Sequence, residues 1–366
     1  MNALEPGLGQ QDGHKINDDD DFMNALVLAR FGTMAVQRRP RPFAATGDVL
    51  LRTIATGICG SDLHGYTGEN GRRALGQIMG HESVATVVRY GDSDSKTRRP
   101  AIGAIVTFNP TIACGHCSAC LSGLTHICAE RRVIGVDPSI SSAFAEFVVV
   151  PAANIVELPP GMPAEHGALV EPLAVGYHAA VRGSVTEGSA VLVIGAGPIG
   201  QSAILASLRL HAATVFVSEP NNARRTVAKQ LGAIPLESDH AVEQVLAATN
   251  GVGVDVAIDA VGLASTVDNA LNATRRGGNT VLVGMNGTRL DIDAYRVSTD
   301  ERALIGAFCY SSDEFVDTVH WASTASDALD QLISSRVCLL DGPDAFRRLA
   351  EGGEGQSKIL VVFDQH

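Results

Sequence analysis

The stretch AVLVIGAGPIG, residues 190–200, decides how the second half of this chain folds. The apolar run 190–194 has the length and composition of a buried strand, and the glycine-rich segment 195–200 opens a helical stretch. In such a unit Gly195 makes the tight turn, Gly197 lets the backbone approach a pyrophosphate, and Gly200 allows the helix to pack closely on the strand. The helix N-terminus also offers N–H groups and the positive end of a dipole to that phosphate. The motif therefore predicts a dinucleotide-binding domain.

The sequence around this motif alternates between strand-like and helical segments. Further strand-like runs lie at 214–218, 254–258 and 280–283, and helical stretches lie near 198–210, 221–231, 240–249 and 263–274. This alternation predicts a parallel sheet with crossover helices. Glu219 follows the second strand, where a carboxylate can accept hydrogen bonds from both ribose hydroxyls and would repel a 2′-phosphate. It favours NAD over NADP, although Arg224 and Arg225 could accommodate a phosphate or could simply be solvated charges.

The first half of the chain is rich in short strands. Apolar or alternating segments at 23–28, 48–58, 82–90, 101–107 and 144–150 are separated by many Gly and Pro residues, which is typical of β-structure. The last fifty or so residues hold mixed short elements and end in the strand-like run 359–363. The predicted fold class is therefore α/β, with a β-rich part and a parallel-sheet part.

Four cysteines are clustered within this β-rich half. They are spaced C-x2-C-x2-C-x7-C, at Cys114, Cys117, Cys120 and Cys128. Four thiolates on a short loop form the usual ligand set of a closed, structural zinc site. Iron–sulfur clusters use a related pattern, but with a last gap of three residues followed by proline. The gap of seven, followed by Ala129, favours a structural zinc over a cluster.

A second set of metal-ligand residues lies in two glycine-bracketed turns. Cys59 lies in the segment 56–64, and His81 and Glu82 follow Gly80. Cys, His and Glu are all competent zinc ligands, and a mixed set leaves room for water or substrate. Taken singly, the cysteine could be a buried small residue and the histidine a hydrogen-bonded turn residue. Together with a zinc lobe and a dinucleotide domain, they predict a catalytic metal site.

Composition limits the partners and the compartment. The 366 residues carry a formal net charge of −12, which argues against nucleic acid as a partner, and no apolar run approaches membrane-spanning length. Residues 1–22 are polar and acidic, so we expect a disordered N-terminal tail. The N-terminus lacks the order of a signal peptide. Seven cysteines, four of them clustered, suit a reducing cytoplasm better than a disulfide framework.

These motifs, taken in order, resemble the zinc-containing medium-chain dehydrogenase/reductase superfamily, the alcohol and polyol dehydrogenases. The resemblance covers residues 23–366 and rests on CGSDLH at 59–64, GHE at 80–82, the four clustered cysteines at 114–128, EPLAV at 171–175 and GAGPIG at 195–200. It implies a GroES-like, β-rich catalytic domain in two sequence pieces around a doubly wound Rossmann domain. The implied division is 1–22 tail, 23–172 catalytic domain with the zinc lobe at 109–130, 173–309 Rossmann domain and 310–366 catalytic domain. It further implies a homodimer or homotetramer, with the apolar segment 303–309 as an edge strand.

The resemblance also implies two zinc ions and NAD(H) as cofactors. Cys59 and His81 would bind the catalytic zinc with Glu82 or Glu171, and sequence leaves open which glutamate does so. Glu171 stands where alcohol dehydrogenases have a cysteine, as in the sorbitol, threonine and butanediol dehydrogenase branch. Asp62 would orient a ligand or cap a turn. The cofactor would contact the residues of the glycine-rich loop and the following strand and helix, namely Gly195, Gly197, Pro198, Ile199, Gly200, Glu219 and Arg224.

The implied reaction interconverts a small secondary alcohol, vicinal diol or polyol and the ketone by hydride transfer. Ser61 would take the hydroxyl proton and His64 would pass it to solvent. A threonine- or sugar-acid-type dehydrogenase of the same fold is the close alternative, and a zinc- and dinucleotide-binding protein without turnover is the alternative from another class. Arg72 and Arg73, in the loop 66–73, are either substrate contacts or ordinary exposed arginines. Cys309 and Cys338 are expected to be buried thiols.

Overall fold

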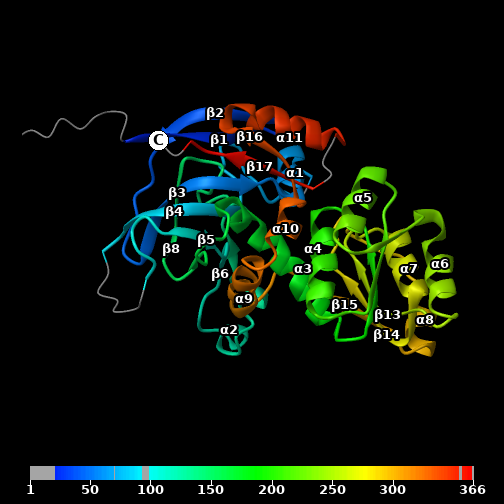
Figure 1. Ribbon diagram of the computed structural model, residues 1–366. Coiled ribbons are helices and arrows are strands. Elements are labelled where there is room, and N and C mark those ends of the chain that lie inside the picture. Colours follow the sequence, from blue (N-terminus) through cyan, green and yellow to red (C-terminus); the bar gives the residue numbers. More distant parts are fainter. Residues whose placement is uncertain (1–20, 70, 93–98, 354–356, 365–366) are drawn as a thin grey trace, which may run out of the picture.

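The computed structural model describes residues 21–69, 71–92, 99–353 and 357–364. Figure 1 shows a β-rich lobe that holds both ends of the described chain and a second lobe built on a parallel sheet, with helices α3 and α4 between them. Nearly all of the predicted N-terminal tail lies outside the described residues. Phe22, the last residue assigned to that tail, already opens strand β1.

The β-rich lobe is built on a seven-stranded sheet. The strand order is β16-β17-β3-β4-β5-β9, with β8 paired to β3, and β1 and β2 form a separate antiparallel hairpin. The strands of the lobe are β1 (Phe22–Arg30), β2 (Thr33–Pro40), β3 (Asp48–Gly57), β4 (Glu82–Tyr90), β5 (Ile105–Phe108), β8 (Phe147–Pro151), β9 (Ile155–Glu157), β16 (Ile333–Cys338) and β17 (Lys358–Val362). Its helices are α1 (Gly60–Thr67), α11 (Gly342–Ala350) and the 3-10 turn η4 (Leu339–Asp341). Because β17 pairs with β3, the end of the chain lies beside the strand that leads to Cys59.

A small lobe projects from this sheet and carries the four clustered cysteines. It consists of β6 (Thr111–Ile112), α2 (Ser118–Leu121), the 3-10 turn η1 (Thr125–Ile127) and β7 (Arg132–Val133). Gly115 and Gly123 both adopt positive φ angles, of 79° and 77°, so they let this short segment turn back on itself. We call the segment 109–133 the cysteine lobe.

The second lobe contains a six-stranded sheet whose strands are all parallel. Their order is β12-β11-β10-β13-β14-β15, which is the Rossmann order 3-2-1-4-5-6 when counted from the first strand of this sheet. The strands are β10 (Ala190–Ile194), β11 (Thr214–Ser218), β12 (Ile234–Leu236), β13 (Val254–Asp259), β14 (Thr274–Leu282) and β15 (Ala303–Gly306). The helices are α4 (Pro198–Arg209), α5 (Asn222–Gln230), α6 (Ala241–Ala248), α7 (Ala264–Ala273) and α8 (Ala294–Thr299), with the 3-10 turn η3 (Ser238–His240).

Helix α3 (Val170–Arg182) joins the two lobes. It follows the 3-10 turn η2 (Ala164–Leu169) and packs on α4 and on α9 (Ser312–Ala322), which precedes α10 (Ser326–Asp330). A single buried apolar cluster includes Val84 of β4, Leu173 of α3 and Val191 of β10. The interior is therefore continuous from one sheet to the other across α3, and the lobes are packed together rather than linked by a bare connection.

Most of the predicted elements are present, and the differences are local. The parallel strands and their helices lie within a few residues of the predicted bounds, although β14 begins at Thr274 rather than near 280. The segment after Cys59 was predicted as a turn, but it forms the helix α1. Helix α3 was not predicted at all. The division into four sequence pieces stays a prediction. Among the described residues, no helix is both long enough and apolar enough to cross a membrane.

Candidate active site

Cys59 lies at the N-cap of α1, directly after strand β3. Its carbonyl accepts hydrogen bonds from the N–H groups of Asp62 and Leu63, which begin the helix. In return the Asp62 carboxylate accepts the Cys59 N–H at 3.1 Å. This reciprocal pair fixes the turn that carries the thiol, so the orientation of Cys59 depends on Asp62.

His81 and Glu82 lie where the chain enters strand β4. The preceding Gly80 has a φ of 99°, and a Cβ at this position would lie 2.8 Å from a methyl carbon of Thr56. Gly57 is equally constrained, since a Cβ there would lie 2.4 Å from Glu82 Oε2. The two glycines therefore allow the chain to bring His81 and Glu82 against the end of strand β3.

The structure brings Cys59, His81 and Glu82 together. One ligand atom from each lies within 4.8 Å of the others, and both His81 and Glu82 are buried. Glu82 accepts a hydrogen bond from Lys358 Nζ at 2.5 Å through Oε1, while its buried Oε2 has no hydrogen-bond partner among the described residues. A buried carboxylate oxygen without a partner, beside a thiol and an imidazole, is the donor set that zinc takes up, so these residues fit a zinc ion.

Glu171 lies in the first turn of α3, the helix that joins the two lobes, and is near the same cluster. It is buried, and Tyr310 donates a hydrogen bond to its Oε1 at 3.0 Å. Burial raises the pKa of Glu171 to about 7, and the Glu82 carboxylate adds to this rise against the opposing effect of His81. Glu171 is therefore close enough to interact electrostatically with Glu82 and His81. It is not part of the group formed by the ligand atoms of Cys59, His81 and Glu82.

Asp62 connects the cluster to a buried cation. Its Oδ1 lies 3.5 Å from His81 Nδ1 and 3.6 Å from a guanidinium nitrogen of Arg73. Burial alone would raise the pKa of Asp62, but His81 and Arg73, with the Cys59 N–H, lower it below its ordinary value. Asp62 is therefore a charged group behind the ligands rather than a simple turn cap. Of the two alternatives for Arg73, the ordinary exposed arginine is excluded, because its side chain is buried.

The two residues predicted to move the proton lie on α1. Ser61 Oγ lies 3.3 Å from His81 Nε2, so the hydroxyl faces the ligand cluster. His64 lies one turn further along the helix, with its side chain 42% exposed and its Nδ1 3.2 Å from Glu69 Oε2. The serine is thus beside the cluster and the histidine is at the solvent edge.

Sequence reasoning missed Lys358 entirely. This lysine opens strand β17 and its side chain is only 3% exposed. Besides Glu82, its ammonium donates to the Ile58 carbonyl at 3.3 Å. The available signal was a cation at the start of the otherwise apolar run 358–362, a position where a lysine needs a buried partner.

The glycine-rich loop has the geometry that a pyrophosphate requires. Gly195 has a φ of 88°, and a Cβ on Gly200 would lie 1.8 Å from the Gly195 carbonyl oxygen, so α4 can approach the turn only because residue 200 is glycine. A Cβ on Gly197 would meet nothing within 4 Å, which leaves open space at the N-cap of α4. Pro198 at the first helical position, followed by Ile199, completes the predicted motif.

Glu219 follows strand β11 and is held by the backbone. Its Oε2 accepts the Ala196 N–H and its Oε1 accepts the Asn221 N–H, both at 2.8 Å, and the residue is 4% exposed. Arg225 donates to the carbonyls of Glu219 and Pro220. The carboxylate is therefore fixed beside the glycine-rich loop, while Arg224 lies half-buried in the first turn of α5.

The four sulfur atoms of the cysteine lobe lie within 4.8 Å of one another, and none of these cysteines is in a disulfide. Hydrogen bonds from the N–H groups of His116 and Cys117 lower the pKa of the Cys114 thiol to about 6. Four convergent thiols, one of them stabilised as a thiolate, fit a closed zinc site. Of the isolated cysteines, Cys309 is partly buried, but Cys338 is exposed, so its predicted burial is wrong.

The cysteine lobe contacts α3, the helix that carries Glu171. The His126 ring lies 4.7 Å from that of His178 in α3, and His178 Nδ1 lies 2.9 Å from a Glu314 carboxylate oxygen in α9. The Arg131 guanidinium lies 5.0 Å from the centre of the Phe308 ring. The lobe is thus packed against the segment that also carries Tyr310.

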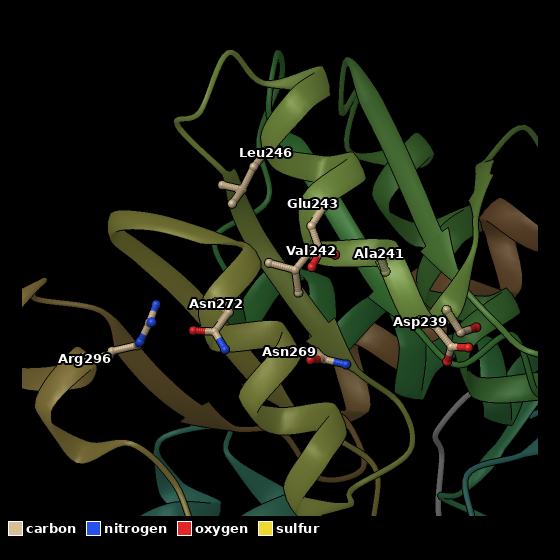
Figure 2. A pocket seen from close by; sticks show the side chains of 9 residues that line it. Asp239, Ala241, Val242, Glu243, Leu246, Asn269, Asn272 and Arg296 are labelled. Carbon is tan, nitrogen blue, oxygen red and sulfur yellow. The ribbon is translucent and has the colours of Figure 1, made fainter.

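A surface cavity of about 310 Å³ lies among α6, α7 and α8, away from these residues (Figure 2). None of its lining residues belongs to either cysteine-containing cluster. Figure 2 shows Arg296 and Glu243 pointing from different helices without meeting, and Arg296 is ion-paired with Asp293. This cavity contributes no group to the chemistry described above.

Comparison with known proteins agrees with this geometry. The family model for a zinc-binding dehydrogenase matches residues 198–324, and that for the alcohol dehydrogenase GroES-like domain matches residues 45–160. The chain is 28% identical to sorbitol dehydrogenase of Bacillus subtilis over 346 residues, covering 93% of this chain and 97% of the relative. It is 36% identical to L-threonine 3-dehydrogenase of Pyrococcus abyssi over 261 residues, covering 69% and 72%.

A solved structure shows the same fold. The zinc-binding dehydrogenase from Sinorhizobium meliloti, bound to NADP, superposes with a TM-score of 0.85 at 30% identity and covers 93% of this chain and 99% of that one. The β-rich lobe is thus a GroES-like domain and the parallel sheet a Rossmann domain, as predicted. The chain belongs to the zinc-dependent medium-chain dehydrogenase/reductase superfamily.

Proposed function

We propose that this protein is a zinc-dependent alcohol or polyol dehydrogenase. It interconverts a small secondary alcohol, vicinal diol or polyol and the corresponding ketone, with NAD(H) as the hydride carrier. The observation that carries the proposal is the group formed by Cys59, His81 and Glu82, whose Oε2 has no partner within the described residues, with Glu171 of α3 nearby. A mixed, buried donor set of this kind is suited to an open catalytic metal site rather than a closed structural one.

The residues divide the chemical work among them. A zinc ion held by Cys59, His81 and a glutamate would supply Lewis acidity toward the substrate oxygen. Ser61, beside His81, is placed to accept the hydroxyl proton, and His64 at the solvent edge is placed to release it. In the reverse direction the same two side chains return a proton to the oxygen as the ketone is reduced.

The cofactor preference we propose is NAD over NADP. Glu219 presents a fixed carboxylate beside the glycine-rich loop, where it would repel a 2′-phosphate. The NADP-bound relative makes the choice worth measuring directly. Titration with NADH and NADPH should give clearly tighter binding of NADH, and Glu219→Ala should reduce the difference. Tighter binding of NADPH to the unaltered protein would reverse this assignment.

The second candidate function is a threonine-type dehydrogenase of the same fold, or one that acts on a sugar acid. The observation that favours it is the 36% identity to a threonine dehydrogenase. A panel of diols, polyols, sugar acids and L-threonine, followed by NADH formation, separates the two candidates. We expect the highest kcat/KM with a diol or polyol. A highest value with L-threonine or a sugar acid would replace our substrate class while leaving the mechanism intact.

We further propose two zinc ions per chain, one in the cysteine lobe and one at the catalytic cluster. The seven cysteines, all free, support a reducing compartment such as the cytoplasm. Strand β15 lies at the edge of the parallel sheet with Leu304 partly exposed, which supports a homodimer or homotetramer formed along this edge. Light scattering tests the assembly, and a monomer would remove that claim without affecting the chemistry.

The experiment that tests the proposed reaction is the substitution His81→Ala. The variant should lose turnover while still binding NADH, because the glycine-rich loop lies in the other lobe. Glu171→Gln serves as a comparison that retains Cys59 and His81, and it should lower activity without abolishing the fold. Full activity in the His81→Ala protein would show that the reaction does not depend on this metal site. No turnover by the unaltered protein with any substrate of the panel would instead favour a zinc- and dinucleotide-binding protein without turnover.

A further inference from the structure

Arg73 is buried in a loop whose neighbouring residues are exposed. Both Arg72 before it and Ala74 after it are exposed, yet the Arg73 side chain is only 1% accessible. Arginine is rarely buried without a partner, because its guanidinium cannot be deprotonated in a protein. The burial of this one side chain in an exposed loop therefore calls for a specific partner beneath it.

The path of the side chain depends on a glycine in α1. A Cβ on Gly65 would lie 2.4 Å from Arg73 Cγ and 3.1 Å from its Nε. The arginine thus crosses the helix where the helix has no side chain. Gly65 does not adopt a positive φ, so its backbone would accept alanine. Space for Arg73, rather than backbone conformation, is what requires glycine at this position.

The path ends at the carboxylate behind the ligands. One terminal nitrogen of Arg73 lies 3.4 Å from the Ser61 carbonyl and 3.6 Å from Asp62 Oδ1, and the other lies 3.4 Å from the Val136 carbonyl. Asp62 Oδ2 accepts the Cys59 N–H, and Asp62 Oδ1 faces His81 Nδ1. A single fully buried carboxylate therefore touches both ligand residues and the guanidinium.

The charge balance explains why the guanidinium is needed. A histidine that binds a metal must be neutral, so a ligating His81 can donate its N–H to Asp62 but cannot neutralise it. Within the part of the chain that the structure describes, the ion pairs of Asp62 are with His81 and Arg73. Arg73 is then the side-chain cation paired with a carboxylate that is fully buried.

We propose that Arg73 is a positioning residue for the catalytic metal site. Its guanidinium holds the Asp62 carboxylate in place, and Asp62 in turn fixes the Cys59 turn and the His81 ring. The inference rests on the proposed metal site and extends it to a loop that sequence alone would assign to the surface. It predicts that metal affinity depends on a side chain that touches neither metal nor substrate.

The test is metal binding to the full chain, measured by competition with a chelator and by the absorption spectrum of the cobalt-substituted protein. Arg73→Met should weaken the catalytic site roughly 10–100-fold and shift the cobalt spectrum, with the cysteine lobe still loaded. Arg73→Lys should recover part of the loss. Arg72→Met, at the exposed neighbour, should match the unaltered protein.

Two further variants protect the test against simple misfolding. Gly65→Ala leaves every charge in place but fills the path of Arg73, so it should reproduce the loss seen in Arg73→Met. In an Asp62→Asn background, Arg73→Met should have little additional effect, because the charge it balances is gone. Unchanged metal affinity and cobalt spectrum in Arg73→Met, or an equal loss in the Asp62→Asn background, would overturn the inference. An unaltered protein that binds only the lobe metal would overturn the proposed metal site itself, and this inference with it.

Discussion

At the scale of single residues, the buried charges around the cluster balance one another in pairs. Glu82 is paired with Lys358, and Asp62 with Arg73, and all four side chains are almost inaccessible to solvent. A buried pair contributes little net stability, but removing one partner leaves an uncompensated charge in the interior. Replacing only one member of either pair should therefore destabilise the folded protein.

Lys358→Met tests this for the pair nearest the ligands. In metal-free protein the change should lower the free energy of unfolding by about 3–5 kcal/mol, because Glu82 then lacks its buried counter-ion. Urea unfolding of the variant and of the Lys358→Met/Glu82→Gln double variant measures the effect. The double variant should regain much of the loss. A loss below about 1 kcal/mol in the single variant would mean that Glu82 does not depend on Lys358.

The residues that could be predicted from sequence are those in local motifs. Cys59, His81 and Glu82 lie in short glycine-bracketed segments, whose local pattern is enough to suggest ligands. Lys358 and Arg73 could not be predicted in the same way, because what buries them lies elsewhere. Lys358 reaches a partner 276 residues away, and Arg73 needs the gap at Gly65.

At the scale of elements, the strand–turn–helix unit around the glycine-rich loop contains one glycine needed for packing and another needed for cofactor binding. Gly200 is required by the close approach of α4 to the Gly195 carbonyl, whereas Gly197 faces open space. Glycine is thus required at the two positions for different reasons. Gly200 is required by packing within the protein, and Gly197 by the close approach of the cofactor.

The pair Gly197→Ala and Gly200→Ala should show this difference. Gly197→Ala should keep its thermal stability, within about 0.5 kcal/mol, but bind NADH roughly tenfold or more weakly, because its methyl occupies the space left for the pyrophosphate. Gly200→Ala should lose about 1–3 kcal/mol of stability through overpacking. Thermal unfolding and NADH fluorescence titration measure the two effects. Unweakened NADH binding in Gly197→Ala would contradict the assignment of this loop.

The helices α1 and α3 were not predicted because Pro and Gly residues near their starts are compatible with a turn as well as with a helix. Pro172 suggests a boundary, but it lies in the first turn of α3, where its missing N–H would have had no helical partner in any case. The glycines around Cys59 suggest a turn, yet Gly60 begins α1 and only Gly68 ends it, with a φ of 82°. Strands β10, β11 and β13 were predictable because they are mostly apolar and are buried on both faces.

At the scale of the whole molecule, the cysteine lobe packs against α3 at the junction between the β-rich lobe and the Rossmann lobe. His126 of the cysteine lobe contacts His178 of α3, and His178 bonds Glu314 at the start of α9. Glu314 also accepts the Ser311 N–H at 2.7 Å, in a capping box. The lobe therefore supports α3, which holds Glu171, and the start of α9, which directly follows Tyr310.

This junction predicts a pH dependence of stability. Burial by itself raises the pKa of Glu314, but the hydrogen bonds from His178 and Ser311 outweigh it and lower the pKa below its ordinary value of 4.5. Because the folded state holds the carboxylate charged, its contribution is present above 4.5 and is lost as pH falls through the lower, folded value. Glu314→Gln should therefore show a shallower loss of unfolding free energy on acidification. Parallel acid profiles for the two proteins would contradict this.

The central claim is that Cys59, His81 and a glutamate form the catalytic zinc site, whereas the cysteine lobe forms a structural one. The most direct measurement is zinc content per chain together with NADH formation from a diol, in the unaltered protein and in His81→Ala. The account predicts two zinc ions and turnover in the first, and one zinc ion, no turnover and retained NADH binding in the second. Unchanged zinc content and turnover in His81→Ala would contradict it.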